Sequence, residues 1–217
     1  MSVVVSVTVN EWFTAAPNNT LADDSSGACV SEVAAPACAR VGSMDGTYTG
    51  QHHANGQREG QGRLEYANGS VYEGEWEADE FHGRGRYASA NGDGYEGEFR
   101  AGVMHGEGQY WFVNGDEYKG HYKNGLHEGH GVYTDASGDK YEGEWKMGVR
   151  EGRGIKTFAD GEFMISRFAG DVPVGDAAVW SADRKEAWLI KDGNLADVKE
   201  ISLEEADRVA ERLDKAR

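Results

Sequence analysis

Aromatic and glycine residues alternate with charged residues in four short segments that recur every 23 residues. Tyr72–Trp76 reads YEGEW, and the same letters return at Tyr141–Trp145; YEGEF begins at Tyr95 and YKGHY at Tyr118. Residues i, i+2 and i+4 of a β-strand lie on one face. Each segment is therefore predicted to be a strand with one aromatic face and one charged face.

A second strand is predicted after each of these segments in the sequence. After YEGEW, for example, Gly83, Gly85 and Tyr87 share one face, and Arg84 and Arg86 share the other. Glycine inside a strand is normally a weakness. Here we infer that the glycines provide space, because a neighbouring Tyr or Trp ring can lie flat on the backbone where a side chain is missing. The glycines assigned this role are Gly74, Gly83, Gly85, Gly97, Gly106, Gly108, Gly120, Gly129, Gly131, Gly143, Gly152 and Gly154.

Asn-Gly, Ser-Gly or Asp-Gly stands shortly before each following unit, as in YANGSVY, FVNGDEY and ADGEF. Such pairs favour the positive φ angles of two-residue hairpin turns. The chain is therefore predicted to be mainly β. We expect an elongated, single-layer antiparallel meander of hairpins, about twelve strands long, that twists into an open trough.

The N-terminal extension, residues 1–47, holds a candidate strand at residues 3–13 (VVVSVTVNEWF) followed by a flexible linker. Three roles for this strand stay open: it adds to a sheet edge, pairs with a partner, or remains mobile. The extension lacks a basic segment typical of a secretory signal. No run in the chain reaches the length needed to cross a bilayer. We therefore expect a soluble, intracellular protein.

The C-terminal part, residues 187–217, is predicted to form a closing strand and a short α-helix. Ser202 and Glu205 have the spacing of a helix N-terminal capping box. An apolar stripe follows, with Val209 beside it; its members are Leu203, Ala206, Ala210 and Leu213. We expect this helix to cap the open end of the sheet, since an exposed edge invites pairing. A partner-binding helix is the alternative.

Composition and charge narrow the classes of partner. Glycine makes up 31 of 217 residues, and the formal net charge is −16. The N-terminal, central and C-terminal parts are each net negative, which disfavours nucleic acid and weakens direct binding to anionic lipid. Cys29 and Cys38 are the two cysteines. A disulfide between them is one alternative, and two free thiols, which an intracellular location favours, are the other.

Several residues suggest chemistry, and each has a structural explanation. His82 and His105 precede Gly-x-Gly motifs, but Glu59, Glu128 and Glu151 fill the same position in other units, which indicates a polar turn position. GDGYEG, residues 92–97, matches a dinucleotide fingerprint, yet a strand follows it where the fingerprint needs a helix. The glutamates of the charged face are expected to form cross-strand ion pairs with Arg84, Arg86 and Arg153. We expect no catalytic residue, no metal and no cofactor.

The aromatic face is the candidate binding site. Accessible aromatic side chains in a concave strip are typical of protein-binding surfaces. The alternative is that the rings are buried against the glycines. The residues concerned are Tyr72, Trp76, Tyr95, Phe99, Tyr118, Tyr122, Tyr141 and Trp145.

The units resemble MORN repeats, with YEGEWEADEFHGRG, YEGEFRAGVMHGEG, YKGHYKNGLHEGHG and YEGEWKMGVREGRG as the clearest copies. The resemblance covers residues 48–186. Five units begin at residues 48, 72, 95, 118 and 141, and a degenerate sixth begins at 164. His52 stands where an aromatic belongs, and Asp79 replaces a turn glycine. We expect these departures to loosen the N-terminal end.

The resemblance implies a non-enzymatic scaffold for protein–protein interaction in a cytoskeletal assembly. A second copy of the chain is a further candidate partner. The segment VPVGDAAVW at 172–180 is similar to the closing variant of MORN proteins of the ciliary radial spoke head, which implies the axoneme of a cilium or flagellum. Two alternatives remain. One is a membrane-associated adaptor for phosphoinositides, and the other is a regulatory subunit of a partner enzyme.

Overall fold

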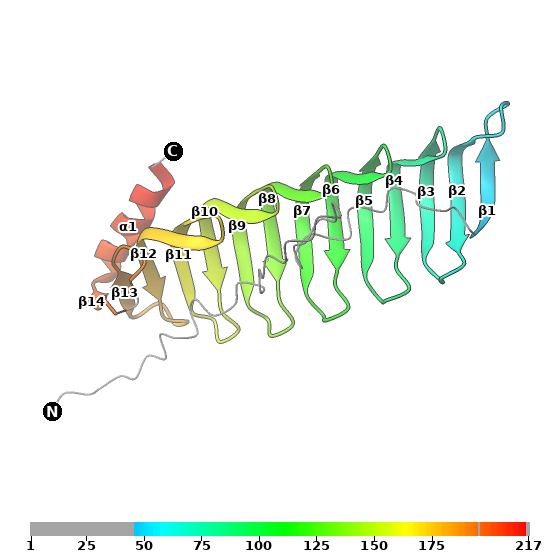
Figure 1. Ribbon diagram of the computed structural model, residues 1–217. Helices are drawn as coiled ribbons and strands as arrows, with labels where there is room; N and C mark the ends of the chain where they lie inside the picture. The colour runs from blue at the N-terminus through cyan, green and yellow to red at the C-terminus, as the bar shows by residue number, and fades with distance from the viewer. Residues whose placement is uncertain (1–45, 195, 216–217) are drawn as a thin grey trace, which may run out of the picture.

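The computed structural model describes residues 46–194 and 196–215, which form one antiparallel sheet of fourteen strands followed by one helix. Figure 1 shows the strands side by side in sequence order along an elongated, open sheet. The predicted fold class is confirmed. The predicted strand at residues 3–13, Cys29 and Cys38 lie outside the described residues. The strands are β1 Gly46–His52, β2 Arg58–Tyr66, β3 Val71–Glu77, β4 Glu80–Ala88, β5 Gly94–Arg100, β6 Val103–Trp111, β7 Glu117–Lys123, β8 Leu126–Thr134, β9 Lys140–Lys146, β10 Val149–Thr157, β11 Phe163–Ala169, β12 Val172–Trp180, β13 Ala187–Ile190 and β14 Val198–Ile201, and the helix is α1 Leu203–Lys215.

The predicted turn positions are right, but the predicted turn type belongs to the other edge of the sheet. In the Asn-Gly loop between β6 and β7, Gly115 alone has a positive φ, 95°. The Phe112 N–H donates to the Asp116 carbonyl, which closes a three-residue loop, and the Asn114 side chain accepts the Asp116 N–H at 3.0 Å. Two consecutive positive φ angles occur instead in the opposite turns, as at Ala101 (50°) and Gly102 (76°).

Each repeat is joined to the next along both edges. On the loop edge, the carboxylate of Asp116 accepts the N–H of Ala136, one repeat further on, at 2.9 Å. On the turn edge, the Gly125 N–H donates to the carbonyl of Met104 at 2.9 Å. Equivalent bonds recur at the same spacing in neighbouring repeats. The stack is therefore held between units as well as within hairpins.

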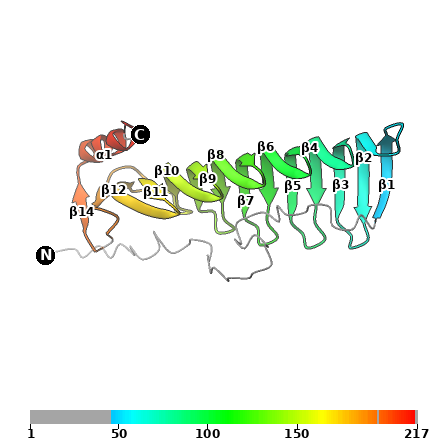
Figure 2. The same cartoon turned by 45° about the horizontal axis from the view of Figure 1, so that its top comes forward.

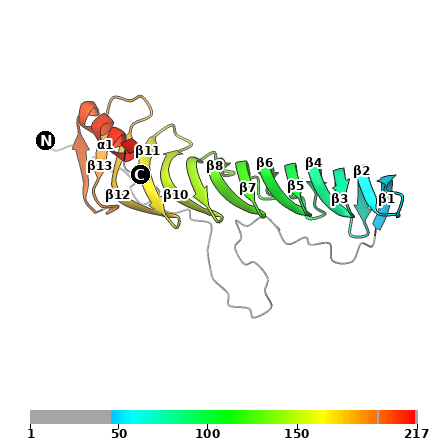
Figure 3. The same ribbon diagram turned by 90° about the horizontal axis from the view of Figure 1, so that it is seen from above.

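The helix does not cap the sheet edge as predicted. Figures 2 and 3 show α1 lying over the face of the last strands, and its buried side chains Ala206, Val209 and Leu213 pack with Ile165 and Trp180. The charged face of the earlier strands turns apolar at β11 and β12, and covering that face is more favourable than covering an edge. The Ser202 hydroxyl accepts the Glu205 N–H at 3.2 Å, as the capping motif predicts. Leu203, a predicted stripe member, is 39% exposed.

Candidate protein-docking surface

The eight candidate aromatic residues form the core of the sheet. Their exposed fractions lie between 0% and 6%. Each tyrosine meets the second aromatic of its own unit and that of the next; the Tyr72 ring lies 5.2 Å from both Trp76 and Phe99, edge to face. The structure therefore has the rings buried, the second of the two alternatives, and does not present them as an accessible strip.

The repeated glycines fall into two kinds, those that lie against an aromatic ring and those that have a positive φ angle. At Gly85, a Cβ atom would lie 2.7 Å from carbon atoms of the Tyr72 ring, so the ring occupies the space of a side chain, as predicted. Gly74 pairs with Gly85 under the same ring. Gly83 differs: it has a φ of 54°, and a Cβ there would meet the Glu75 carboxylate and not a ring. The role predicted for Gly83, Gly106, Gly129 and Gly152 is therefore wrong, because these residues form β-bulges with positive φ.

The bulge places one more side chain of each repeat on the aromatic face, where it stacks on the tyrosine ring. The ladder between β3 and β4 shifts register at Gly74 and Glu75. Phe81, just before the bulge, then stacks on Tyr72 with ring centroids 3.6 Å apart. The side chain at this position recurs every 23 residues, as Arg58, Phe81, Met104, His127 and Arg150. The sequence reading missed this position because its residues share size but not chemical type.

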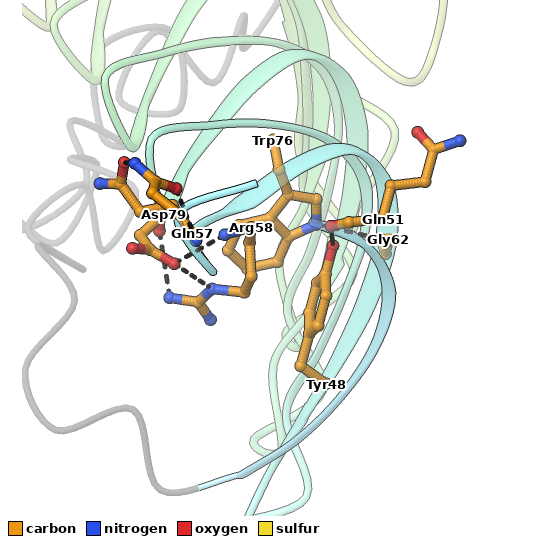
Figure 4. A network of polar contacts seen from close by, with 8 residues as sticks. Tyr48, Gln51, Gln57, Arg58, Gly62, Trp76 and Asp79 are labelled. Carbon is orange, nitrogen blue, oxygen red and sulfur yellow. Dashed lines mark hydrogen bonds and ion pairs between the residues drawn. The ribbon is translucent and has the colours of Figure 1, made fainter. Parts of the chain in front are cut away.

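Where this position holds arginine, the next turn holds aspartate. Figure 4 shows Arg58 between the Asp79 carboxylate and the Trp76 ring; the guanidinium carbon lies 4.3 Å from the ring centroid, and Nε lies 3.1 Å from the carboxylate. The Arg58 backbone N–H and guanidinium lower the pKa of the Asp79 carboxyl. Arg150 and Asp171 repeat this arrangement at 3.0 Å. The expectation that Asp79 loosens packing is therefore wrong, because its charge is paired.

His127 is the polar exception in the core. It is 2% exposed and stacks on Tyr118 at 3.5 Å, in the place that Phe81 occupies over Tyr72. Neither ring nitrogen has a hydrogen-bond partner in the described part of the chain. Burial lowers the pKa of His127 to about 3, so the ring is neutral.

The opposite face of the sheet carries an open polar groove of about 1180 Å³ that runs from β2 to β8. We call it the polar groove. Trp111 and Val132 add partly exposed apolar surface to a lining that is otherwise charged, polar or glycine. Its charged members are Glu73, Glu75, Arg84, Arg86, Glu96, Glu98, Glu107 and Lys119, together with His121 and His130.

Few charges in the polar groove are neutralised by neighbours. Glu73 pairs with Arg63 at 3.0 Å. The predicted cross-strand pairs of Arg84 and Arg86 are not formed: within residues 46–194 and 196–215, neither guanidinium lies within 4.0 Å of a carboxylate oxygen. Arg63 and Glu73 lie directly opposite in register and do pair, so opposition in register alone does not decide which charges meet. Arg153 pairs with Asp214 of α1 instead. The groove therefore offers unpaired charges of both signs.

The described residues contain no group of three or more His, Cys, Asp or Glu side chains placed to hold a metal ion. Within the same residues, no helix is long and apolar enough to span a membrane. The motif GDGYEG ends in β5, as expected, so its glycines belong to a loop and a strand. The arrangement offers a surface for binding a polar macromolecular segment.

These features define a β-hairpin repeat array with a buried aromatic face and an open polar face. The family model for the MORN repeat matches residues 54–71, 72–94, 95–117, 118–140 and 141–163. Because the matches span just over half of its 217 residues, the chain belongs to the MORN-repeat family. Beyond the matched region, β11 and β12 continue the sheet, and Gly175 has the bulge φ of 69°.

Solved structures give only weak likeness. The chain is similar to the SAS-4 (dCPAP) TCP domain of Drosophila melanogaster in complex with a proline-rich motif of Ana2 (dSTIL), at 14% identity, 71% of this chain, 90% of that chain and a TM-score of 0.38. The chain is also similar to the TCP10c domain of Drosophila melanogaster Sas-4. The identity is 16%, the match covers 67% of this chain and 100% of that chain, and the TM-score is 0.33. No curated protein matches the chain.

Proposed function

We propose that this protein is a non-enzymatic scaffold of a cytoskeletal assembly, and that the polar groove holds a segment of a partner protein. The observation that carries the proposal is the groove itself, a long depression with unpaired charges on a sheet whose other face is a closed aromatic core. A rigid surface loses little conformational entropy when a partner binds.

The chemistry of the groove favours a protein segment over a nucleic acid or an anionic membrane. Arginine and tryptophan are enriched among residues that dominate binding energy at protein interfaces, and Arg84, Arg86 and Trp111 all line the groove. Glutamates interleaved with them repel a polyanion. A segment carrying both charges can pair with each sign.

The axoneme of a cilium or flagellum is the assembly we propose. The support is the Pro-Val-Gly variant at Pro173–Gly175, similar to the closing unit of MORN proteins of the radial spoke head. In the structure this segment lies in β12, at the end of the array next to α1.

The charge-reversal variant R84E/R86E tests the proposal in flagellated cells that express the tagged full chain. We expect the wild-type protein to remain with detergent-extracted axonemes. We expect R84E/R86E to move to the soluble fraction, with at least about a tenfold loss of affinity for the retained partner, since each arginine is worth about 1–2 kcal/mol at an interface. Quantitative mass spectrometry of both fractions measures the distribution.

R100E/K146E is the matched control, because Arg100 and Lys146 are exposed on the sheet but do not line the groove. It makes the same change in charge and should stay with the axonemes. Equal loss of both variants would contradict the groove as the docking site. Absence of the wild-type protein from every cytoskeletal fraction would contradict the assembly.

A further inference from the structure

Within the part of the chain that the structure describes, the first strand of the sheet is an edge that lacks the usual protections. Among the described residues β1 has one hydrogen-bonded neighbour, β2. Its side chains are exposed except for Tyr48, which is half-buried. The opposite edge strand, β14, has only four residues and carries Lys199 and Glu200. Short length and charge are ordinary protections of an edge against pairing, and β1, with seven residues, has neither.

The absence of Asp, Glu, Lys and Arg from β1 distinguishes it from the equivalent strands of the next four repeats. The equivalent strands β3, β5, β7 and β9 each carry at least three charged residues. In β1, Thr47, Thr49 and Gln51 occupy the polar face. A second strand can therefore pair with β1 without desolvating a charge.

Tyr48 also lacks a neighbour that later tyrosines have. Tyr95 faces Tyr87 on the preceding strand, and Tyr118 faces Tyr110. Two residues away from each tyrosine pair, glycine faces glycine, as at Gly85 and Gly97. A strand that completes the array before β1 is therefore expected to place a large apolar residue opposite Tyr48, since Tyr72 faces Leu64 in the same way, and a glycine opposite Gly50.

The sequence of β1 supplies that strand. Residues 46–50 read Gly-Thr-Tyr-Thr-Gly, the same in both directions. In an antiparallel pair of two copies related by a two-fold axis, Tyr48 faces Tyr48 of the second copy, and Gly46 faces Gly50. Thr47 then faces Thr49, a favourable cross-strand pair. A palindromic strand meets the requirement of a two-fold interface that one surface complements itself.

We propose that two copies of this chain pair through β1, with the two-fold axis at Tyr48, to form one continuous sheet from two fourteen-stranded halves. The pairing repeats the tyrosine and glycine register found between units. It leaves the polar grooves of both copies open. Because one strand pair is a small interface, the dimer should be weak and should dissociate on dilution.

Sedimentation velocity of the full chain over a range of concentrations tests this dimer. We expect a monomer–dimer equilibrium for the wild-type protein. In the variant T47K/T49K each introduced lysine faces another lysine across the axis, and T47E/T49E opposes carboxylates in the same way. Each variant alone should sediment as a monomer, with at least a tenfold weaker association. An equal mixture of the two should regain the dimer, because lysines then face glutamates.

V113K/M147K adds the same charge as T47K/T49K at two exposed sites away from β1, and it should dimerise like the wild-type protein. Restoration in the mixture separates the proposal from misfolding, which mixing cannot repair. A wild-type monomer at all concentrations would overturn the proposal and leave the edge to another strand. A dimer that persists in T47K/T49K, or a mixture that stays monomeric, would also overturn it.

Discussion

The variant G108A is expected to lose about 3 kcal/mol of unfolding free energy, the upper end of the range of about 1–3 kcal/mol for overpacking a filled core, because the aromatic ring that the new Cβ would meet is itself tightly packed. A Cβ atom at Gly108 would lie 2.6 Å from two carbon atoms of the Tyr95 ring. That ring is 1% exposed and is held from the next unit by Tyr122 at 5.2 Å. It has no space to move without opening the neighbouring repeat. Urea unfolding followed by tryptophan fluorescence measures the effect.

G94A is the matched control in the same sheet. A Cβ atom at Gly94 would meet its nearest atom, on the Trp111 ring, at 3.5 Å, an ordinary contact. The substitution should be neutral or stabilise by about 0.5 kcal/mol, because alanine has less freedom than glycine in the unfolded chain. Similar losses in G108A and G94A would show that the glycines do not serve to seat the rings.

Acid should weaken the array through His127. In the unfolded chain its pKa is about 6.5, and burial lowers the folded value to about 3. Below pH 6.5 the unfolded state therefore binds a proton that the folded state does not, and stability falls as pH falls towards 3. Above pH 6.5 both states are neutral and the effect is absent. At pH 4.5 the loss is about 2.7 kcal/mol, at about 1.36 kcal/mol per unit.

H127F should remove this loss, because Phe81 occupies the same position in another repeat and stacks in the same way on Tyr72. Urea unfolding at pH 7.5 and pH 4.5 measures the difference for both proteins. H130Q, at an exposed residue of the polar groove, should lose stability between the two pH values as the wild-type protein does. An H127F protein with an unchanged acid loss would show that His127 is not the group responsible.

The faces of the strands could be predicted because side-chain alternation depends only on the backbone. Tyr72 and Tyr87 face each other as their positions in the pattern require. The capping role of Ser202 could be predicted for the same reason, since it depends on residues three apart. Such local rules need no knowledge of the remainder of the chain.

The buried face of the sheet could not be predicted, because the alternation of residue types does not say which of the two faces packs into a core. That choice follows from the bulge at Gly83, which brings Phe81 over Tyr72 and buries the aromatic side. Gly83 and Gly85 look alike in sequence, yet one needs a positive φ and the other makes room for a ring. The position of α1 was missed because it depends on the change of one face from charged to apolar at Ile165 and Trp180.

Arg58 and Asp79 show that two positions of the repeat depend on each other. The two positions are 21 residues apart, and Arg150 and Asp171 repeat both the residue types and the spacing. Taken singly, Asp79 is a departure from the turn glycine. Taken with Arg58, it is the partner of a buried guanidinium.

Hydroxyl-radical footprinting of the full chain, free and bound to a partner recovered with it from the cytoskeletal fraction, tests the division of the sheet into a closed aromatic face and an open polar face. Free protein should be oxidised at Trp111 and protected at Tyr72, Tyr95, Tyr118 and Tyr141, and the bound form should gain protection at Trp111 alone among these residues. Oxidation of the four tyrosines in the free protein, with protection on binding, would show that partners dock on the aromatic face and would contradict this account.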